Sequence, residues 1–219
     1  MSQFAIDLKY QDIPDESIWE AKRFLLDSIG CALAAVNNED MGSMYRFVEK
    51  LGGNLEASLI GVKTKTNASN AALMNCLLTR ALDYNDIYWE EDPAHPSDII
   101  GAALAAAEAN GKSGKDALIA IIIAYELTLR WCHAAKPGVR EIGWHHASLI
   151  QFVSPFVAGK MYDLDLDQMV AAAGISGSSH FTLGGVVAGH LTNMKNTAAP
   201  LASQAGVIAA MMAKEGYSG

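Results

Sequence analysis

Two neighbouring segments of this chain, residues 97–110 and 114–134, are apolar on nearly every side of the helix that their sequence predicts. A helix of that kind needs cover all round, so it lies at the centre of a helical protein or at a subunit interface. The uninterrupted apolar runs inside them are about half of the ~20 residues that a membrane span requires. We therefore expect two buried helices, no membrane partner, and a homodimer formed through a helical face.

The rest of the chain also follows a helical period. In residues 13–36 the apolar side chains recur at three- and four-residue spacings, and Pro14 stands where a first helical turn accepts proline. No repeat or linker marks an internal boundary, so we expect one all-α domain over residues 1–219. Further helical patterns cover residues 41–52, 67–82, 146–162, 166–178 and 197–215, and the one strand candidate is 56–61.

Capping residues support these helix boundaries. Gly111 follows one predicted helix as a C-terminal cap, and Ser113 with Asp116 gives the next helix a Ser-x-x-Asp start. Asp165 with Gln168 opens another helix in the same manner. The predicted boundaries are therefore supported by the chemistry of their ends as well as by periodicity.

Charge excludes two classes of partner. The net charge of −8 opposes binding to nucleic acid or to an anionic membrane, because both need a basic surface. A few local cations could still bind a small anionic substrate. The N-terminus lacks the apolar stretch of a secretory signal, and Cys31, Cys76 and Cys132 stand far apart in apolar contexts. We expect reduced core thiols and a cytoplasmic protein.

Two motifs resemble ligand sites without meeting their requirements. "NGKS" at 110–113 would need a glycine at position 106 to form a phosphate-binding loop, but that position is Ala106, and no strand precedes it. "GWHHAS" at 143–148 contains His145 and His146, and adjacent side chains on a helix point about 100° apart. We therefore expect neither a nucleotide site nor a metal site.

The stretch "LDYNDIYWEEDPAHPSD" at 82–98 concentrates acidic residues between two apolar helices. The like charges of Glu90, Glu91 and Asp92 are typical of a solvated loop. Asp83 differs, because it ends an apolar helix, where the helix dipole disfavours a negative charge. We expect His95 to be its partner, with the carboxylate raising the histidine pKa and orienting the ring as a general acid/base requires.

A glycine-rich segment at 174–196 leads to Lys195, which we expect to precede the last helix. Its glycines could serve close helix packing or approach to a ligand, and the residues alone leave both open. A packed or capping role is likewise the alternative for each histidine. Together the residues are consistent with a metal-free cleft that contains Asp, His and Lys.

Several separated motifs carry a resemblance to a known family. "RALDYNDIYWEEDPAHPSD", "AALAAAEANGKSG", "AYE", "GWHHAS", "AAAGISGS" and "MKNTAAPLASQAGVIAAMMAKEGYSG" follow one another from about residue 5 to the end. In this order they resemble the MmgE/PrpD family, which includes 2-methylcitrate dehydratase, cis-aconitate decarboxylase and iminodisuccinate epimerase.

The resemblance implies a dimer of helical domains, each with a smaller α+β lid domain, that uses no cofactor and acts on di- or tricarboxylates. Residue by residue, it places the helical domain's catalytic groups at Asp83, His95, His145 and Lys195. His95 would transfer the proton with Asp83 holding it. Substrate carboxylates would be bound by His145 and Lys195, with Ser97 as a further substrate contact.

The implied reaction is a dehydration like that of 2-methylcitrate dehydratase, with decarboxylation or epimerisation of a related acid as the alternative. Ile87 stands where family members often carry a threonine, so one substrate contact differs. Family members continue for roughly as many residues again, and that part forms the lid. The resemblance therefore implies a fragment, a split enzyme with a separate lid subunit, or a non-catalytic helical binding module.

Overall fold

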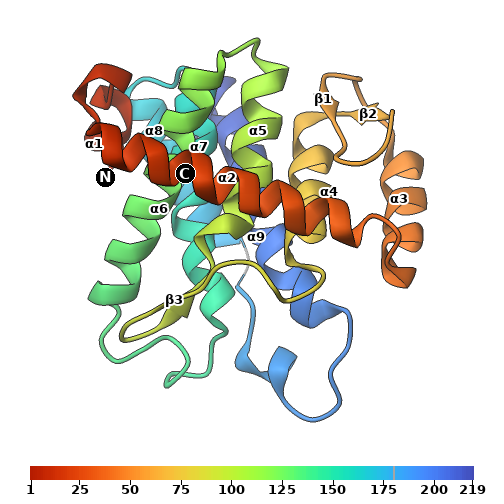
Figure 1. Ribbon diagram of the computed structural model, residues 1–219. Coiled ribbons are helices and arrows are strands. Elements are labelled where there is room, and N and C mark those ends of the chain that lie inside the picture. Colours follow the sequence, from red (N-terminus) through yellow and green to blue (C-terminus); the bar gives the residue numbers. More distant parts are fainter. Residues whose placement is uncertain (180) are drawn as a thin grey trace.

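The computed structural model describes residues 1–179 and 181–219, and in these ranges the chain is mainly helical with very little sheet (Figure 1). The predicted all-α class is confirmed. The α-helices are α1 (Ser2–Asp7), α2 (Asp15–Ala35), α3 (Glu39–Leu51), α4 (Ala68–Arg80), α5 (Ile100–Ala109), α6 (Gly114–Ala134), α7 (Ser154–Met161), α8 (Leu166–Ser179) and α9 (Met194–Lys214). The 3₁₀ segments are η1 (Tyr10–Asp12), η2 (Pro96–Ile99), η3 (His146–Phe152) and η4 (Gly184–Val187).

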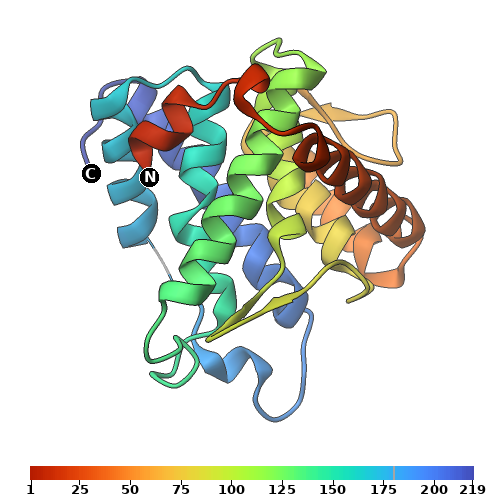
Figure 2. The same ribbon diagram turned by 60° about the vertical axis from the view of Figure 1, so that its left-hand side comes forward.

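The long helices form a bundle in which α4, α5, α7 and α9 pack against one another. Helix α4 packs against α5 and α9, α7 packs against α9 and α6, and α2 lies across the bundle over α4 and α6 (Figures 1 and 2). The two chain ends lie on the same side of the molecule in both views. The opposite ends of the helices meet at the lower edge of both figures, where the loops before η2, η3 and α9 gather.

The two helices predicted to be apolar all round are indeed central. Most of α5 is buried, and Gly101 brings it close to α4, because a Cβ at that position would lie 2.6 Å from the Cys76 backbone nitrogen. By length and composition α6 could cross a membrane, yet 56% of its apolar window is buried inside the fold, as in a core helix of a soluble protein. These two helices supply much of the hydrophobic core.

The predicted caps are confirmed. Gly111 has φ +61° just beyond Asn110, the C-cap of α5, and Ser113 and Asp116 form a reciprocal capping box at the start of α6. Asp165 and Gln168 likewise bond to each other's backbone N–H groups before α8. The three cysteines are buried and free, as predicted.

Four local predictions differ in part from the structure. Segment 146–162 is η3 followed by α7, because Pro155 has no N–H to continue a helix and belongs in a first turn. Segment 97–110 begins as 3₁₀ η2 before α5, and α9 already begins at Met194, so Lys195 lies in its first turn rather than before it. The strand candidate at 56–61 is reduced to β1 (Ala57–Ser58), which pairs with β2 (Lys65–Thr66) in a hairpin.

Helix α1 and a second hairpin are among the elements that had no counterpart in the sequence prediction. Helix α1 precedes the first predicted helix, and a second hairpin joins β3 (Tyr88–Trp89) to β4 (Pro93–Ala94). This second hairpin is important for the site, because it closes the acidic stretch on itself between Asp86 and His95.

Candidate functional site

The four residues assigned to catalysis come from four separate parts of the fold and meet where the helix ends gather. Asp83 follows α4, His95 caps η2, His145 caps η3, and Lys195 lies in the first turn of α9. Lys195 bonds to Asp83, and the rings of His95 and His145 both lie against His146. The two groups are close enough for His95 to act electrostatically on Asp83 and for Lys195 to act on His145. Their assembly was predicted, but several of the partnerships within the cluster were not.

Asp83 has two cationic partners. Its Oδ1 lies 3.0 Å from an Arg80 nitrogen and its Oδ2 lies 2.5 Å from Lys195 Nζ. The hydrogen bond from Lys195 holds the pKa of Asp83 below its usual range, and the charge of Arg80 acts in the same direction. The expectation that this helix-end carboxylate needs a partner is confirmed, but the expectation that His95 is that partner is wrong.

His95 bonds instead to backbone. Its Nδ1 contacts the carbonyl oxygen of Asp86, and since a carbonyl only accepts, Nδ1 carries the proton. In the neutral ring Nε2 then holds the lone pair. Burial, aided by the charge of Arg80, lowers the pKa of His95, so the predicted rise is wrong. The ring is therefore a neutral base at pH 7 rather than a charged acid.

His145 has the opposite tautomer. It lies just before η3 in extended backbone, where its Nδ1 accepts the Ala147 N–H at 3.2 Å. Nε2 therefore carries the proton, and the ring can donate a hydrogen bond without being charged. Burial lowers the pKa of His145 to about 4, and nearby Arg80 lowers it further. When both rings are neutral, His145 can therefore donate a hydrogen bond while His95 acts as a base.

His146 lies between these two rings. Its centroid is 4.0 Å from that of His145 and 5.5 Å from that of His95, so the adjacent histidine rings lie against each other at a tilt rather than pointing apart as on a helix. Burial lowers the pKa of His146 to about 2. Across residues 1–179 and 181–219, no three His, Cys, Asp or Glu side chains are arranged to hold a metal ion. His180, in the glycine-rich segment, lies outside these residues.

A buried polar network behind the histidines was missed by sequence reasoning. Asp86 is its hub: Tyr125 donates to Oδ2 at 2.6 Å, and the Ser97 hydroxyl and N–H both donate to Oδ1. The Asn85 amide donates to Ser97 Oγ at 2.8 Å and to Asp98 at 3.0 Å. The Ser97 hydroxyl thus donates one hydrogen bond, to Asp86, and accepts another, from Asn85. Its role as a substrate contact stays a prediction.

Asp98 is the most deeply buried acid of this network. Burial raises its pKa to about 7, while Arg80 acts in the opposite direction. Arg80 is itself 4% exposed and bonds to Asn85 as well as to Asp83. One buried guanidinium therefore influences the charge state of Asp83, His95 and Asp98 together.

The acidic run before Pro93 is divided in the structure. Glu90 and Glu91 are exposed, as predicted, but Asp92 is 0% exposed. Its carboxylate accepts from Arg140 Nε at 2.9 Å and from the Val139 N–H. The prediction of a solvated loop is therefore wrong for Asp92, which fixes this hairpin to the loop before η3.

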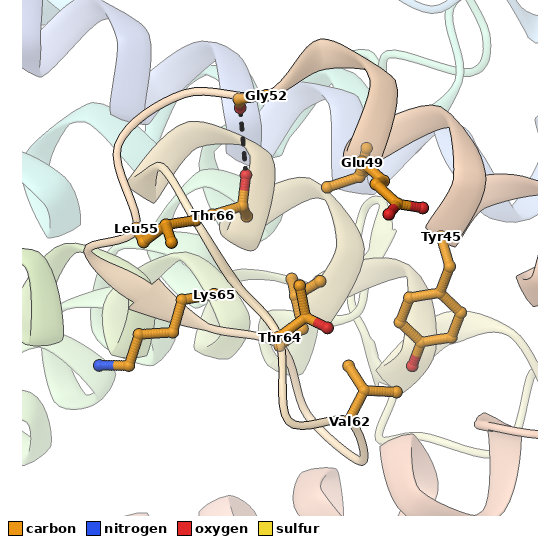
Figure 3. Close-up of a pocket in the computed structure, with 10 residues that line it drawn as sticks. Tyr45, Glu49, Gly52, Leu55, Val62, Thr64, Lys65 and Thr66 are labelled. Atoms are coloured by element: carbon orange, nitrogen blue, oxygen red, sulfur yellow. Dashed lines mark hydrogen bonds between the residues drawn. The ribbon is translucent and has the colours of Figure 1, made fainter.

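Space for a ligand lies beside Lys195. A cavity of about 340 Å³ opens between the start of α9 and the start of α3, lined by Lys195, Asn196, Thr197 and Ser43 among others. Another cavity, of about 400 Å³, lies between α3 and the β1–β2 hairpin (Figure 3). Its lysine, Lys65, points away from Tyr45 and Glu49 and pairs with Glu108, so that second cavity is a poor place for an anion.

Several exposed apolar side chains lie on the same segments of the chain as the charged cluster, or next to them in sequence. They lie on the segments that gather at the lower edge of Figures 1 and 2. Exposed apolar side chains gathered on neighbouring segments are typical of an interaction site. The exposed residues are Leu82, Tyr84, Ile87, Trp89, Ile142, Leu183, Val187, Leu191 and Met194.

This helical architecture and this cluster define a helical domain whose polar site lies at one end of the bundle. The sequence model of the MmgE/PrpD N-terminal domain matches residues 1–219. The chain therefore belongs to the MmgE/PrpD family, and the resemblance noted from its motifs is confirmed.

Individual relatives agree with this assignment. The chain is 28% identical to a cis-aconitate decarboxylase-like protein of Aspergillus oryzae, over all of this chain and 47% of the relative. It is 29% identical to the 2-methylcitrate dehydratase of Escherichia coli K12, over 89% of this chain and 42% of the relative. A cis-aconitate decarboxylase of Aspergillus terreus is 27% identical over 98% of this chain and 45% of the relative. The chain thus spans less than half the length of these three relatives.

Proposed function

We propose that this chain is the helical half of a lyase that acts on a di- or tricarboxylate, with a dehydration like that of 2-methylcitrate dehydratase as the reaction we favour. The observation that carries the proposal is the pairing of two neutral imidazoles of opposite tautomer, His95 and His145, next to the cations Lys195 and Arg80. Relatives named for dehydration and for decarboxylation of such acids support the substrate class.

The chemistry needs a base and fixed positive charge. Removing a proton from a carbon next to a carboxylate builds negative charge, which fixed cations and hydrogen-bond donors stabilise. We assign proton transfer to His95 Nε2. Lys195 and His145 would hold substrate carboxylates, with Asp83 keeping Lys195 in place until the substrate arrives. In a dehydration the hydroxyl group then leaves with a proton as water.

Decarboxylation or epimerisation is the alternative within the same site. Both reactions pass through the same kind of negative charge, so the cluster alone supports all three. The relatives include both dehydratase and decarboxylase names. The cluster and the relatives therefore support the substrate class, a polycarboxylate, more strongly than they support one particular reaction.

We further propose that the exposed apolar surface around the cluster meets a lid, either a further domain or a separate chain, in a cytoplasmic homodimer that works without a metal or organic cofactor. The relatives' greater length supports a lid. The apolar residues at 82–89, 142 and 183–194 support an interaction at this face. Left uncovered, this face should make the chain associate, which light scattering would reveal.

The test is proton NMR in D₂O with a panel of citrate-like and succinate-like acids, with and without a lid chain. Deuterium entering one carbon identifies both the substrate and the proton that is removed. We expect His95→Ala and Lys195→Ala each to slow turnover about 10²-fold or more. Lys65→Ala is the matched control, because Lys65 also pairs with a carboxylate but lies away from the cluster.

The contrary outcomes are equally defined. If both variants stay within about twofold of the unmodified chain, the residue assignment fails. If no acid exchanges even with a lid chain present, the alternative of a non-catalytic helical binding module is favoured.

A further inference from the structure

We propose that Tyr125 is a positioning residue that fixes the tautomer of His95 by holding Asp86 in place, a role that rests on the proposed function. The Tyr125 hydroxyl bonds to Asp86 rather than to the imidazole. It acts through one intermediate residue whose carboxylate and backbone carbonyl have different partners.

Asp86 connects Tyr125 to His95, because its side chain bonds to one and its backbone carbonyl bonds to the other. Its side-chain Oδ2 accepts the Tyr125 hydroxyl at 2.6 Å, and its backbone carbonyl accepts the proton of His95 Nδ1. A carboxylate fixed in direction also fixes the peptide next to it, because few torsions separate them. The carbonyl is thereby aimed at Nδ1, which leaves Nε2 free to act as the base.

Tyr125 is suited to this task because its helix is part of the core. Its ring stacks on Phe24 of α2 with centroids 4.7 Å apart. Burial and the charge of Asp86 raise the pKa of the hydroxyl, so it remains a donor throughout the working range of pH. The anchor is therefore rigid, neutral and unable to accept the proton that His95 takes.

The loop that carries Asp86 and His95 needs such an anchor from outside itself. The β3–β4 hairpin links the two residues to each other, and Ser97 bonds to Asp86 from the start of η2. These contacts fix the loop internally. Tyr125, 39 residues further along the chain, attaches it to α6.

Nitrogen NMR on the 219-residue chain tests the inference without any substrate. In ¹⁵N-histidine-labelled protein at neutral pH, the His95 signals, assigned by their loss in His95→Gln, should show a protonated Nδ1 and an unprotonated Nε2. In Tyr125→Phe, which keeps the ring and its stacking, we expect a mixture of both tautomers. Tyr45→Phe is the matched control, since it removes a hydroxyl that donates to the Ile60 carbonyl far from the cluster.

Kinetics give a second readout. Once the substrate is known, we expect Tyr125→Phe to lower kcat about 10-fold or more with KM within about twofold, because the base is misplaced while the carboxylate-binding groups are intact. A loss of folding alone would instead reduce the amount of active enzyme in proportion, as active-site titration shows.

Two results would overturn the inference: a wild-type His95 with its proton on Nε2, or a Tyr125→Phe spectrum identical to the wild type. If Tyr125→Phe does not fold, Asp86→Asn replaces it, since it weakens the same acceptor while keeping its size. The proposed function fails separately, through an absence of turnover in the wild type, and that outcome leaves the NMR result as it stands.

Discussion

Lys195 and Asp83 lie 112 positions apart in the sequence, and their side chains meet at 2.5 Å, linking the start of α9 to the end of α4. The lysine proposed to bind substrate is thus already paired with a carboxylate. A substrate must compete with Asp83 for the ammonium group. Arg80, on the other side of Asp83, retains the carboxylate while that exchange takes place.

Removing this carboxylate should cost stability in a pH-dependent way. Lys195 and Arg80 lower the pKa of Asp83 in the folded chain, so its contribution is present above the unfolded pKa and is lost as pH falls below about 4. We expect Asp83→Asn to be less stable by about 1 kcal/mol at pH 7, with a smaller difference at pH 3. Urea denaturation at the two pH values measures this, with Glu126→Gln as a control for an exposed ion pair. A difference that grows on acidification would contradict the assignment.

The three clustered histidines should titrate in a fixed order. Burial lowers the pKa of His95 below 6.5, that of His145 to about 4 and that of His146 to about 2. An NMR titration should show His146 neutral throughout and His145 protonating only after His95. Since the unfolded chain binds these protons near pH 6.5, the free energy of unfolding should decrease as pH falls below that value. A His145 midpoint above that of His95 would contradict this structure of the site.

Neutralising two neighbouring acids of the same loop, Asp92 and Glu91, should have very different effects on stability. Asp92 is wholly buried and bonds to Arg140 and to backbone, so Asp92→Asn should cost about 2 kcal/mol of stability. Glu91 is exposed and pairs with Lys136 at 3.3 Å, so Glu91→Gln should change stability by less than about 0.5 kcal/mol. Thermal unfolding of both variants is the measurement, and equal effects would show that Asp92 is solvated after all.

Two helical glycines offer a matched pair for the packing of α5 on α4. A Cβ at Gly101 would lie 2.6 Å from the Cys76 backbone nitrogen, so Gly101→Ala should destabilise the fold by about 1–3 kcal/mol. Nothing lies within 4 Å of a Cβ at Gly30 in α2, so Gly30→Ala should stabilise it by about 0.5–1 kcal/mol. Urea denaturation compares the two, and a gain in stability for both would mean that α4 and α5 can separate freely.

Periodicity and capping chemistry predicted most of the helices because both are local properties. The capping box at Ser113 and the glycine after α5 depend on residues within a few positions of one another. The prediction of one helix over 146–162 was wrong for an equally local reason, since Pro155 marks the start of a new helix that the apolar spacing alone does not reveal. Hairpin β3–β4 is too short to leave a periodic signal.

The partnerships within the site could not be predicted in the same way. The sequence places Asp83 twelve positions before His95, and that proximity suggested a pair. In the fold Asp83 has φ +51° in the turn that follows α4, a left-handed conformation that Asp tolerates. Its carboxylate meets Arg80 and Lys195 instead of His95. No spacing rule connects residues from separate helices.

The contact between Tyr125 and Asp86 could not be predicted from the sequence either. Both stand in motifs that carry the family resemblance, "AYE" and "DYNDI", yet nothing in either motif says that the two side chains meet. A polar side chain on a largely apolar helix was the available signal. It indicates that a partner exists without identifying it.

The bond between His95 Nδ1 and the Asp86 carbonyl also restricts how a proton can travel. A carbonyl cannot pass a proton onward, so a proton that arrives at Nε2 cannot leave through the far side of the ring into a relay. It must depart from the atom on which it arrived. In any reaction that this ring serves, the proton therefore enters and leaves through Nε2 alone, and from that atom it either returns to the reacting molecule or exchanges with solvent.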